Sequence, residues 1–249
     1  RLIWLDPAGG FVPALDDVRA MLASGVKAIG LVSPNNPTGA IYPADLLRAI
    51  FEACREAGAW LILDETYRDF LPKGQRPHDL LSVPGWEDNL ILLYSFSKSF
   101  CIPGHRLGAI TTGARAVAEI AKVMDNLQIC APRAPQAAVA RALPALKDWR
   151  NANRAEIAAR ASTLRAVMAE LPEWKMESVG AYFAFIRHPF PGTPSAKVAE
   201  QLTLKAGVVC IPGAYFGEGQ ENYLRFAFAN ADSATIASLT GRLADFKVA

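Results

Sequence analysis

The stretch Leu90-Ile91-Leu92-Leu93-Tyr94-Ser95-Phe96-Ser97-Lys98 joins an uncharged apolar run to a run rich in hydroxyl groups. Such an apolar run is typical of a strand that is buried on both faces of a parallel sheet. A lysine directly after this strand lies at the carboxyl end of the sheet, where ligands of open α/β folds bind. Arg106 follows shortly after. The stretch therefore predicts an amine beside a guanidinium group that could hold an anion.

The sequence on both sides of this stretch alternates between apolar runs of strand length and segments of helical period. This alternation predicts an α/β fold, a three-layer arrangement in which helices cover a mostly parallel sheet. A crossover helix is predicted over 43–58, since a proline stands at its start and a glycine after its end, and another helix over 114–126. The predicted strands are Ala28–Val32, Trp60–Leu63, Leu90–Tyr94 and Leu107–Thr111.

The last hundred residues have a different pattern and predict a smaller α+β domain. After Pro132 and Pro135, an alanine-rich helical stretch runs to about Glu170, with a kink expected at Pro144. We expect a large domain at residues 1–145, followed by a bridging helix and small C-terminal domain at 146–249. The small domain is predicted to contain strands at 182–187, 208–211 and 223–228 and helices at 196–206 and 233–246.

Composition excludes several classes of function. The chain has 249 residues, is 51% hydrophobic and carries a formal net charge of +2, so neither nucleic acid nor an anionic membrane is an expected partner. No window approaches the roughly 18 apolar residues of a membrane span, and we expect a cytoplasmic protein. The histidines and cysteines have no metal-ligand spacing, so we expect no metal site. These residues are His78, His105, His188, Cys54, Cys101, Cys130 and Cys210.

Polar clusters follow three of the predicted strands. They are Ser33–Gly39, Asp64–Tyr67 and the lysine segment, and all three are predicted to lie at the same edge of the sheet. Alone, the first would be an ordinary turn, the second a solvated loop or helix cap, and Lys98 a surface lysine. Together they predict one binding site.

Four motifs occur in a characteristic order: Asn36-Pro37-Thr38-Gly39, Asp64-x-x-Tyr67, Ser95-x-Ser97-Lys98 with Gly104-x-Arg106-x-Gly108, and Tyr223-Leu224-Arg225-Phe226. In this order the sequence resembles the class I/II aminotransferases of the fold-type I pyridoxal phosphate family, over essentially the whole chain. The resemblance implies pyridoxal 5′-phosphate as cofactor and an amino acid and a 2-oxo acid as substrates. It also implies a homodimer.

The resemblance further implies a role for each motif residue. Lys98 would form a Schiff base with the cofactor and then move a proton. Asp64 would keep the pyridine nitrogen protonated. Tyr67 and Asn36 would approach the 3′ oxygen of the ring. Arg106 and Ser95 would bind the phosphate, with Ser97 as a second hydroxyl donor, and Arg225, with Asn36 nearby, would bind the substrate α-carboxylate.

Members of the family begin with an arm, a phosphate-binding loop that opens a helix, and an aromatic residue that stacks on the cofactor. No segment upstream of Asn36 matches these features, and Arg1–Asp6 reads as the middle of a strand. We therefore expect a large domain that is incomplete at its N-terminus. Either the chain derives from a longer parent, which we favour, or it is a half-site with weakened cofactor binding. The missing helix N-terminus would ordinarily contribute to binding of the phosphate.

Other functions are compatible with parts of the pattern. Ser95-x-x-Lys98 also fits the serine acyl-transferase signature, but the Ser-Asp-Asn and Lys-Thr-Gly motifs that accompany it do not occur. A pyridoxal phosphate-dependent C–S β-lyase or a decarboxylase could use the same residues. A third alternative is a non-catalytic, aminotransferase-like effector domain of a transcription regulator.

Overall fold

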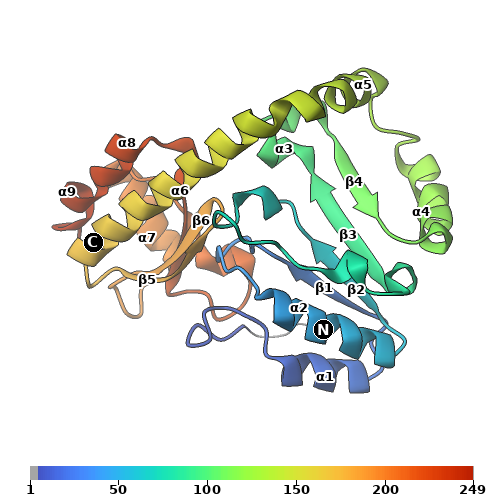
Figure 1. Cartoon of the computed structure of the whole chain (residues 1–249). Helices are drawn as coiled ribbons and strands as arrows, with labels where there is room; N and C mark the ends of the chain where they lie inside the picture. Colours follow the sequence, from blue (N-terminus) through green and yellow to red (C-terminus); the bar gives the residue numbers. More distant parts are fainter. Residues whose placement is uncertain (1–4, 249) are drawn as a thin grey trace. The chain divides into compact units, whose positions relative to one another are not determined.

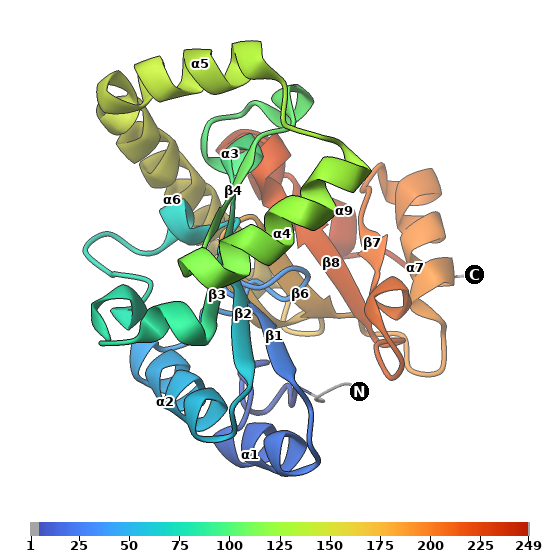
Figure 2. The same ribbon diagram turned by 90° about the vertical axis from the view of Figure 1, so that its right-hand side faces the viewer.

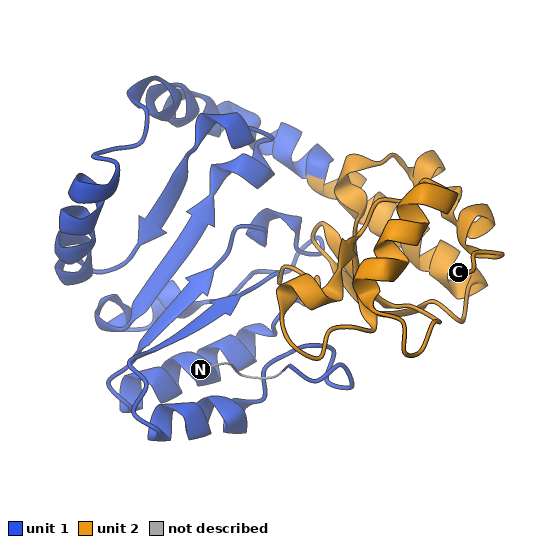
Figure 3. Cartoon of the chain, turned by 180° about the vertical axis from the view of Figure 1, so that it is seen from behind, with its two compact units in different colours: residues 1–34, 41–153 blue, residues 35–40, 154–249 orange. Residues whose placement is uncertain are grey.

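A computed structural model of the chain describes residues 5–248, which form two compact units. The first unit comprises residues up to 34 and 41–153, and the second comprises residues 35–40 and those from 154 onward (Figure 3). Most of the strand suggested for Arg1–Asp6 lies outside the described residues, and Leu5 and Asp6 belong to no strand. The sequence pattern gave no sign that the short segment 35–40 belongs with the C-terminal half.

The first unit is built on a four-stranded sheet of order β1-β2-β3-β4 (Figure 1). Strands β1 (Ala28–Val32), β2 (Trp60–Asp64) and β3 (Leu90–Ser95) run parallel, and β4 (Gly108–Thr111) is antiparallel to β3. Val32 pairs with Asp64, and Asp64 pairs with Leu93. The carboxyl ends of the three parallel strands therefore meet at one edge of the sheet.

Helix α2 (Ala44–Glu56) connects β1 to β2 and packs against α1 (Leu15–Ala23) and β2. Its apolar face is fully buried at Leu47, Ile50, Phe51 and Cys54. Burial of a side chain of this size contributes about 1.5–3 kcal/mol, so this face fixes the helix on the sheet. The sequence did not predict α1, because only two of its residues are buried.

The helical stretch expected up to Glu170 is present but interrupted. It consists of α5 (Arg133–Ala142), a 3-10 turn η5 (Leu143–Leu146) and α6 (Lys147–Glu170), and the break falls at Pro144 as predicted. Helix α4 (Ala114–Leu127) precedes them and lies beside β4 in Figures 1 and 2. None of its residues is buried. The boundary between the two units falls within α6.

The second unit contains an antiparallel sheet of order β5-β6-β8-β7. Its strands are β5 (Lys175–Gly180), β6 (Phe183–Arg187), β7 (Ile211–Pro212) and β8 (Tyr223–Ala227). The helices are α7 (Ser195–Gln201) with its π-helical continuation η6 (Leu202–Ala206), α8 (Ser233–Ala237) and α9 (Leu239–Leu243). The predicted strand 208–211 is wrong except at its end, because only Ile211 and Pro212 pair with β8. The predicted α/β fold, with a smaller α+β part after it, is confirmed.

Short elements connect these strands and helices. They are η1 (Arg68–Phe70), η2 (Leu80–Ser82), η3 (Trp86–Asp88), α3 (Phe96–Ser99), η4 (Pro103–His105), η7 (Gly213–Phe216) and η8 (Phe228–Asn230).

Among the described residues, no helix has both the length and the hydrophobicity needed to cross a bilayer.

Candidate functional site

The loop after β2 carries Asp64 and Tyr67. The Asp64 carboxylate accepts hydrogen bonds from the backbone N–H of Thr66, at 2.9 Å, and from its hydroxyl, at 2.7 Å, both to Oδ1. Such a bond from a residue two positions on closes a turn and fixes the rotamer of the carboxylate. Tyr67 follows and is 5% exposed. The sequence therefore places a fixed carboxylate and a buried tyrosine next to each other at the end of a central strand.

A cluster around the buried Glu65 contacts this loop. Glu65 is 1% exposed, and its Oε2 lies 2.9 Å from Arg68 Nη1. Its other oxygen lies 3.0 Å from Nε2 of His78. Nδ1 of His78 accepts the N–H of Leu80 at 3.2 Å, which holds the imidazole next to the carboxylate. The cluster connects the loop after β2 to the segment before η2.

The predicted lysine lies in the short helix α3, which begins where β3 ends. Ser95 is its N-cap, and its Oγ accepts the N–H of Ser97 at 3.3 Å. Ser97 and Ser99 are buried, whereas Lys98 between them is only partly exposed to solvent. The strand therefore ends directly in a turn that presents Lys98, with hydroxyl groups on either side of it.

Arg106 lies between η4 and β4, in the segment that leads into the strand paired with β3. Gly108 pairs with Ser95 in the antiparallel ladder, and Phe96 donates its N–H to the Leu107 carbonyl at 3.2 Å. Arg106 has a positive φ of 51°, and its Nη1 donates to the Pro103 carbonyl at 2.8 Å. This strand pairing brings Arg106 back toward the turn that carries Lys98. The guanidinium is exposed to solvent.

A second network connects the lysine-bearing strand to the tyrosine-bearing loop. The hydroxyl of Tyr94, the penultimate residue of β3, donates to Asp69 Oδ2 at 2.5 Å, and Asp69 lies in η1 just after Tyr67. Arg150 of α6 lies 3.5 Å from the other oxygen of Asp69. Burial, followed by the hydrogen bond to Asp69, raises the pKa of Tyr94 well above its usual range. The network therefore links the end of β3 to η1, the element that follows Tyr67.

In the second unit, residues Asn35–Ala40 form a closed turn. The backbone N–H of Asn35 donates to the Ala40 carbonyl at 2.8 Å, and the backbone N–H of Gly39 donates to the Asn35 carbonyl at 2.8 Å. The side-chain oxygen of Asn35 accepts the hydroxyl of Thr38 at 2.8 Å. The peptide bond before Pro37 is cis. These bonds leave Asn36 exposed at the tip of a rigid turn.

The same turn packs backbone against backbone on the β5–β6 hairpin. Gly39 has a φ of 76°, and a Cβ at this position would collide with the carbonyl of Phe183 and the backbone of Gly180. Only glycine satisfies both constraints. The Ser178 hydroxyl also donates to the Thr38 carbonyl at 2.5 Å. This packing explains why six residues from the first half of the sequence belong to the second unit.

Arg225 lies in the middle of β8, and its Nη1 donates to Oδ1 of Asn36 at 2.8 Å. Its guanidinium carbon lies 4.7 Å from the ring centroid of Phe183 and 5.1 Å from that of Phe216. The structure thus brings together two predicted residues that are 189 positions apart in the sequence. The two aromatic neighbours were not predicted, because a phenylalanine in a strand or a short turn is ordinarily interpreted as part of the hydrophobic core.

The sequence as a whole matches one family. The family described as "Aminotransferase class I and II" matches residues 4–243. The chain belongs to the class I and II aminotransferase family. The resemblance inferred from the motifs is therefore confirmed, and with it an α/β fold of the aminotransferase type.

Among similar aminotransferases is an aromatic aminotransferase of Arabidopsis thaliana, which is 29% identical over 87% of this chain and 54% of its own length. An aspartate aminotransferase of Pyrococcus horikoshii is 27% identical over 92% of this chain and 59% of its own. The solved aspartate aminotransferase from Thermus thermophilus with maleate superposes with a TM-score of 0.86 at 26% identity, over 97% of this chain and 62% of the other. The chain thus spans little more than half the length of the curated relatives that it matches.

The structure assigns the predicted residues of this aminotransferase-family chain to two groups. In the first unit, one group belongs to segments at or next to the carboxyl ends of β2 and β3: Asp64, Tyr67, Ser95, Ser97, Lys98 and Arg106. Within the second unit, Asn36 and Arg225 are in direct contact. Their roles toward a cofactor or substrate stay predictions. Within residues 5–248, no three His, Cys, Asp or Glu side chains gather as a metal-binding cluster.

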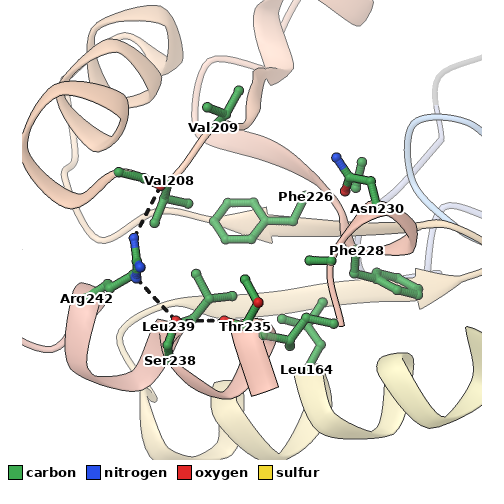
Figure 4. A pocket seen from close by; sticks show the side chains of 14 residues that line it. Leu164, Val208, Val209, Phe226, Phe228, Asn230, Thr235, Ser238, Leu239 and Arg242 are labelled. Carbon is green, nitrogen blue, oxygen red and sulfur yellow. Dashed lines mark hydrogen bonds between the residues drawn. The ribbon is translucent and has the colours of Figure 1, made fainter. Parts of the chain in front are cut away.

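The second unit contains a pocket of about 300 Å³ (Figure 4). Its walls include Leu164, Val208, Phe226 and Phe228, and Arg242 lies at one end, where Nη1 donates to the Ala206 carbonyl at 2.9 Å. Successive side chains of a strand point to opposite faces, so the pocket at Phe226 and the guanidinium of Arg225 lie on opposite faces of β8. None of the predicted site residues lines this pocket.

Proposed function

We propose that this chain carries the lysine-bearing part of a pyridoxal phosphate-dependent aminotransferase, which moves an amino group between an amino acid and a 2-oxo acid. The observation that carries the proposal is the meeting of the Asp64–Tyr67 loop and the Lys98 turn at the carboxyl ends of adjacent parallel strands. Membership in the class I and II aminotransferase family supports assigning aminotransferase chemistry to this group of residues.

The side chains fit such a cofactor. A carboxylate, an amine, a buried phenol, a guanidinium and two hydroxyls belong to segments around one end of one sheet. When bound, pyridoxal phosphate supplies an electron sink that stabilises negative charge on the substrate Cα. We propose that Arg106, Ser95 and Ser97 hold the phosphate, because a guanidinium and hydroxyl groups are suitable donors to its oxygens.

Each remaining residue has a defined task in this proposal. Asp64, whose rotamer Thr66 fixes, holds a proton on the pyridine nitrogen. Tyr67 and the Nδ2 group of Asn36 donate to the 3′ oxygen of the ring, which is compatible with Asn36 Oδ1 being used by Arg225. The Lys98 amine would hold the cofactor through its aldehyde group and, once free, would take the proton from the substrate Cα and return it.

Arg225 binds the substrate α-carboxylate in this proposal. A guanidinium fork matches a carboxylate with two parallel hydrogen bonds, which orients the substrate for loss of its Cα proton. The Thermus aspartate aminotransferase was solved with maleate, a dicarboxylate, which is compatible with a carboxylate-binding family site. A homodimer is part of the same proposal, and light scattering of the purified protein tests it.

The proposed reaction is tested in two half-reactions with pyridoxal phosphate and a panel of L-amino acids that includes phenylalanine and aspartate. A transaminase forms one equivalent of 2-oxo acid per site, stops, and resumes when a different 2-oxo acid is added. A β-lyase releases ammonia and a thiol from cystathionine or cysteine conjugates without an added 2-oxo acid, and a decarboxylase releases carbon dioxide. Either of these results, or no product that depends on Lys98, contradicts the proposal.

A further inference from the structure

The guanidinium of Arg225 has an aromatic environment that the proposed chemistry does not by itself require. Phe183 and Phe216 both place their rings against it, at 4.7 and 5.1 Å from the guanidinium carbon. Each contact lies within the distance at which a cation is attracted to the face of a ring. Phe183 is 5% exposed and Phe216 is 36% exposed. We call these three side chains the arginine clamp.

The rings are held in place by the backbone of the second unit. Phe183 lies on β6, where it is the diagonal neighbour of Arg225 on the same face of the sheet, because Phe185 pairs with Arg225. Phe216 ends the short helix η7, and that helix is anchored by a hydrogen bond of 3.2 Å from the Ala214 N–H to the hydroxyl of Ser195. Ser195 is completely buried.

A close backbone approach also fixes the start of η7. A Cβ on Gly213 would lie 2.7 Å from the Tyr223 carbonyl of β8 and closer still to the carbonyl of Gln220. The first residue of η7 therefore packs directly on the strand that carries Arg225. Phe216 stands at a defined place beside this strand, and its contact with the guanidinium is a property of the fold of the second unit.

The clamp restricts how Arg225 can bind a partner. A guanidinium is planar, and all its N–H groups point outward in that plane. The two rings lie over the guanidinium carbon and shield part of the group from water, while bonds in its plane remain possible, as the bond to Asn36 Oδ1 shows. We infer that Phe183 and Phe216 are positioning residues that hold the Arg225 plane ready for an equally planar carboxylate. This inference rests on the proposed role of Arg225 in substrate binding.

The clamp has a consequence for specificity. A planar carboxylate can lie in the plane of the guanidinium and accept two parallel bonds, whereas a tetrahedral phosphonate cannot place all its oxygens there. The site then selects α-carboxylates over α-phosphonates by geometry as well as by charge. Lysine cannot replace arginine in the clamp, because an ammonium group is a point charge without a plane that rings could orient.

Phe216→Leu is the test variant, since leucine keeps apolar volume at a half-exposed position but removes the ring face. Tyr215→Leu is the matched control, because Tyr215 is adjacent, 72% exposed and outside the clamp. In NMR of protein with isotope-labelled arginine, the Arg225 Nε–H signal, assigned with Arg225→Lys, is expected to shift in Phe216→Leu and to stay unchanged in Tyr215→Leu. An unchanged signal in Phe216→Leu would contradict the clamp.

A kinetic test of the same variants uses L-phenylalanine, its phosphonate analogue and 2-phenylethylamine, which lacks the carboxyl group. Phe216→Leu is expected to raise KM for phenylalanine by about 3- to 30-fold, the range that loss of one cation–π contact implies. We expect kcat to change less than about twofold, binding of the amine to stay the same, and the preference for carboxylate over phosphonate to shrink. An unchanged KM in Phe216→Leu, while Arg225→Lys raises it, overturns the inference and leaves the proposed function standing.

A different pair of results would support the clamp and contradict the proposed function. Titration with phenylalanine can be followed by the Arg225 Nε–H signal without any turnover. If this titration is saturable, and weaker in Phe216→Leu, while no Lys98-dependent product forms, the clamp is supported and the proposed function fails.

Discussion

The two groups of predicted residues are held by different kinds of structure. In the first unit, Asp64, Ser95 and Lys98 lie at strand ends and turns, and local hydrogen bonds hold Asp64 and the Ser95 cap. In the second unit, Arg225 lies within a strand and is flanked by two aromatic rings. The first arrangement suits groups that hold or move protons, and the second suits a group that orients a ligand. We therefore expect substitutions in the two groups to affect different kinetic constants.

Asp64→Asn should have the largest effect and should act on kcat. Asparagine keeps the size of the side chain and can still accept the bonds from Thr66, but it removes the negative charge. Loss of one such preorganised electrostatic group lowers kcat by about 100- to 1000-fold. KM for the amino acid should stay close to that of the wild type, which steady-state kinetics would measure.

The control for this variant is Asp88→Asn, which removes an exposed carboxylate in η3. It should leave both constants unchanged. A large rise in KM with an unchanged kcat in Asp64→Asn would break the proposed difference between the two groups.

Tyr94→Phe should reduce stability, because it removes the hydroxyl that links the end of β3 to Asp69. Hydrogen bonds to charged groups contribute about 1.5–3 kcal/mol, and partial burial places this one near the lower limit. Urea unfolding should show a loss of about 1.5 kcal/mol in the free energy of unfolding. Tyr215→Phe, at an exposed position, should change it by less than about 0.5 kcal/mol. Equal losses in both variants would show that the network does not stabilise the first unit.

His188 should make the stability of the second unit depend on pH. Its Nδ1 accepts the N–H of Phe190 at 3.3 Å and its Nε2 lies 3.1 Å from the Glu221 carbonyl, so the folded ring is neutral. Burial lowers the pKa of His188 below its ordinary value. In the unfolded state, with a pKa of about 6.5, the ring gains a proton as the pH falls. The unfolded state then binds more protons than the folded state, and stability decreases.

Urea unfolding between pH 7.5 and 5.5 measures this effect, which is the smallest of the series. The decrease is at most about 1.4 kcal/mol per pH unit below pH 6.5. His188→Asn should lose this part of the pH dependence, whereas His105→Asn, at an exposed position in η4, should keep it. A wild-type stability that rises on acidification through this range would contradict the assignment.

Much of the first unit could be predicted from sequence, because buried parallel strands are nearly continuous apolar runs and the chemistry follows directly at their ends. The strand ending at Tyr94 and the turn with Lys98 are of this kind. Strand β5 was missed because KMESVG is largely polar and its ladder contains an irregularity near Met176. Val208–Cys210 reads as a strand by propensity, but Val209 is 78% exposed and pairs with no described strand.

The aromatic part of the clamp could not be predicted, because it depends on contacts between residues far apart in the sequence. Phe183, Phe216 and Arg225 come from three different elements. The placement of Asn36 beside Arg225 likewise depends on the packing of Gly39 against the β5–β6 hairpin. The motif residues were recognisable one by one, whereas their arrangement is a property of the tertiary structure.

The central claim is that Lys98 carries the cofactor, and covalent trapping tests it most directly. The protein is incubated with pyridoxal phosphate, reduced with borohydride and digested, and the modified peptide is identified by mass spectrometry. We expect one modified lysine, Lys98, and loss of the modification in Lys98→Ala, while Lys122→Ala, at an exposed position in α4, keeps it. Modification of a different lysine, or none, would contradict the account.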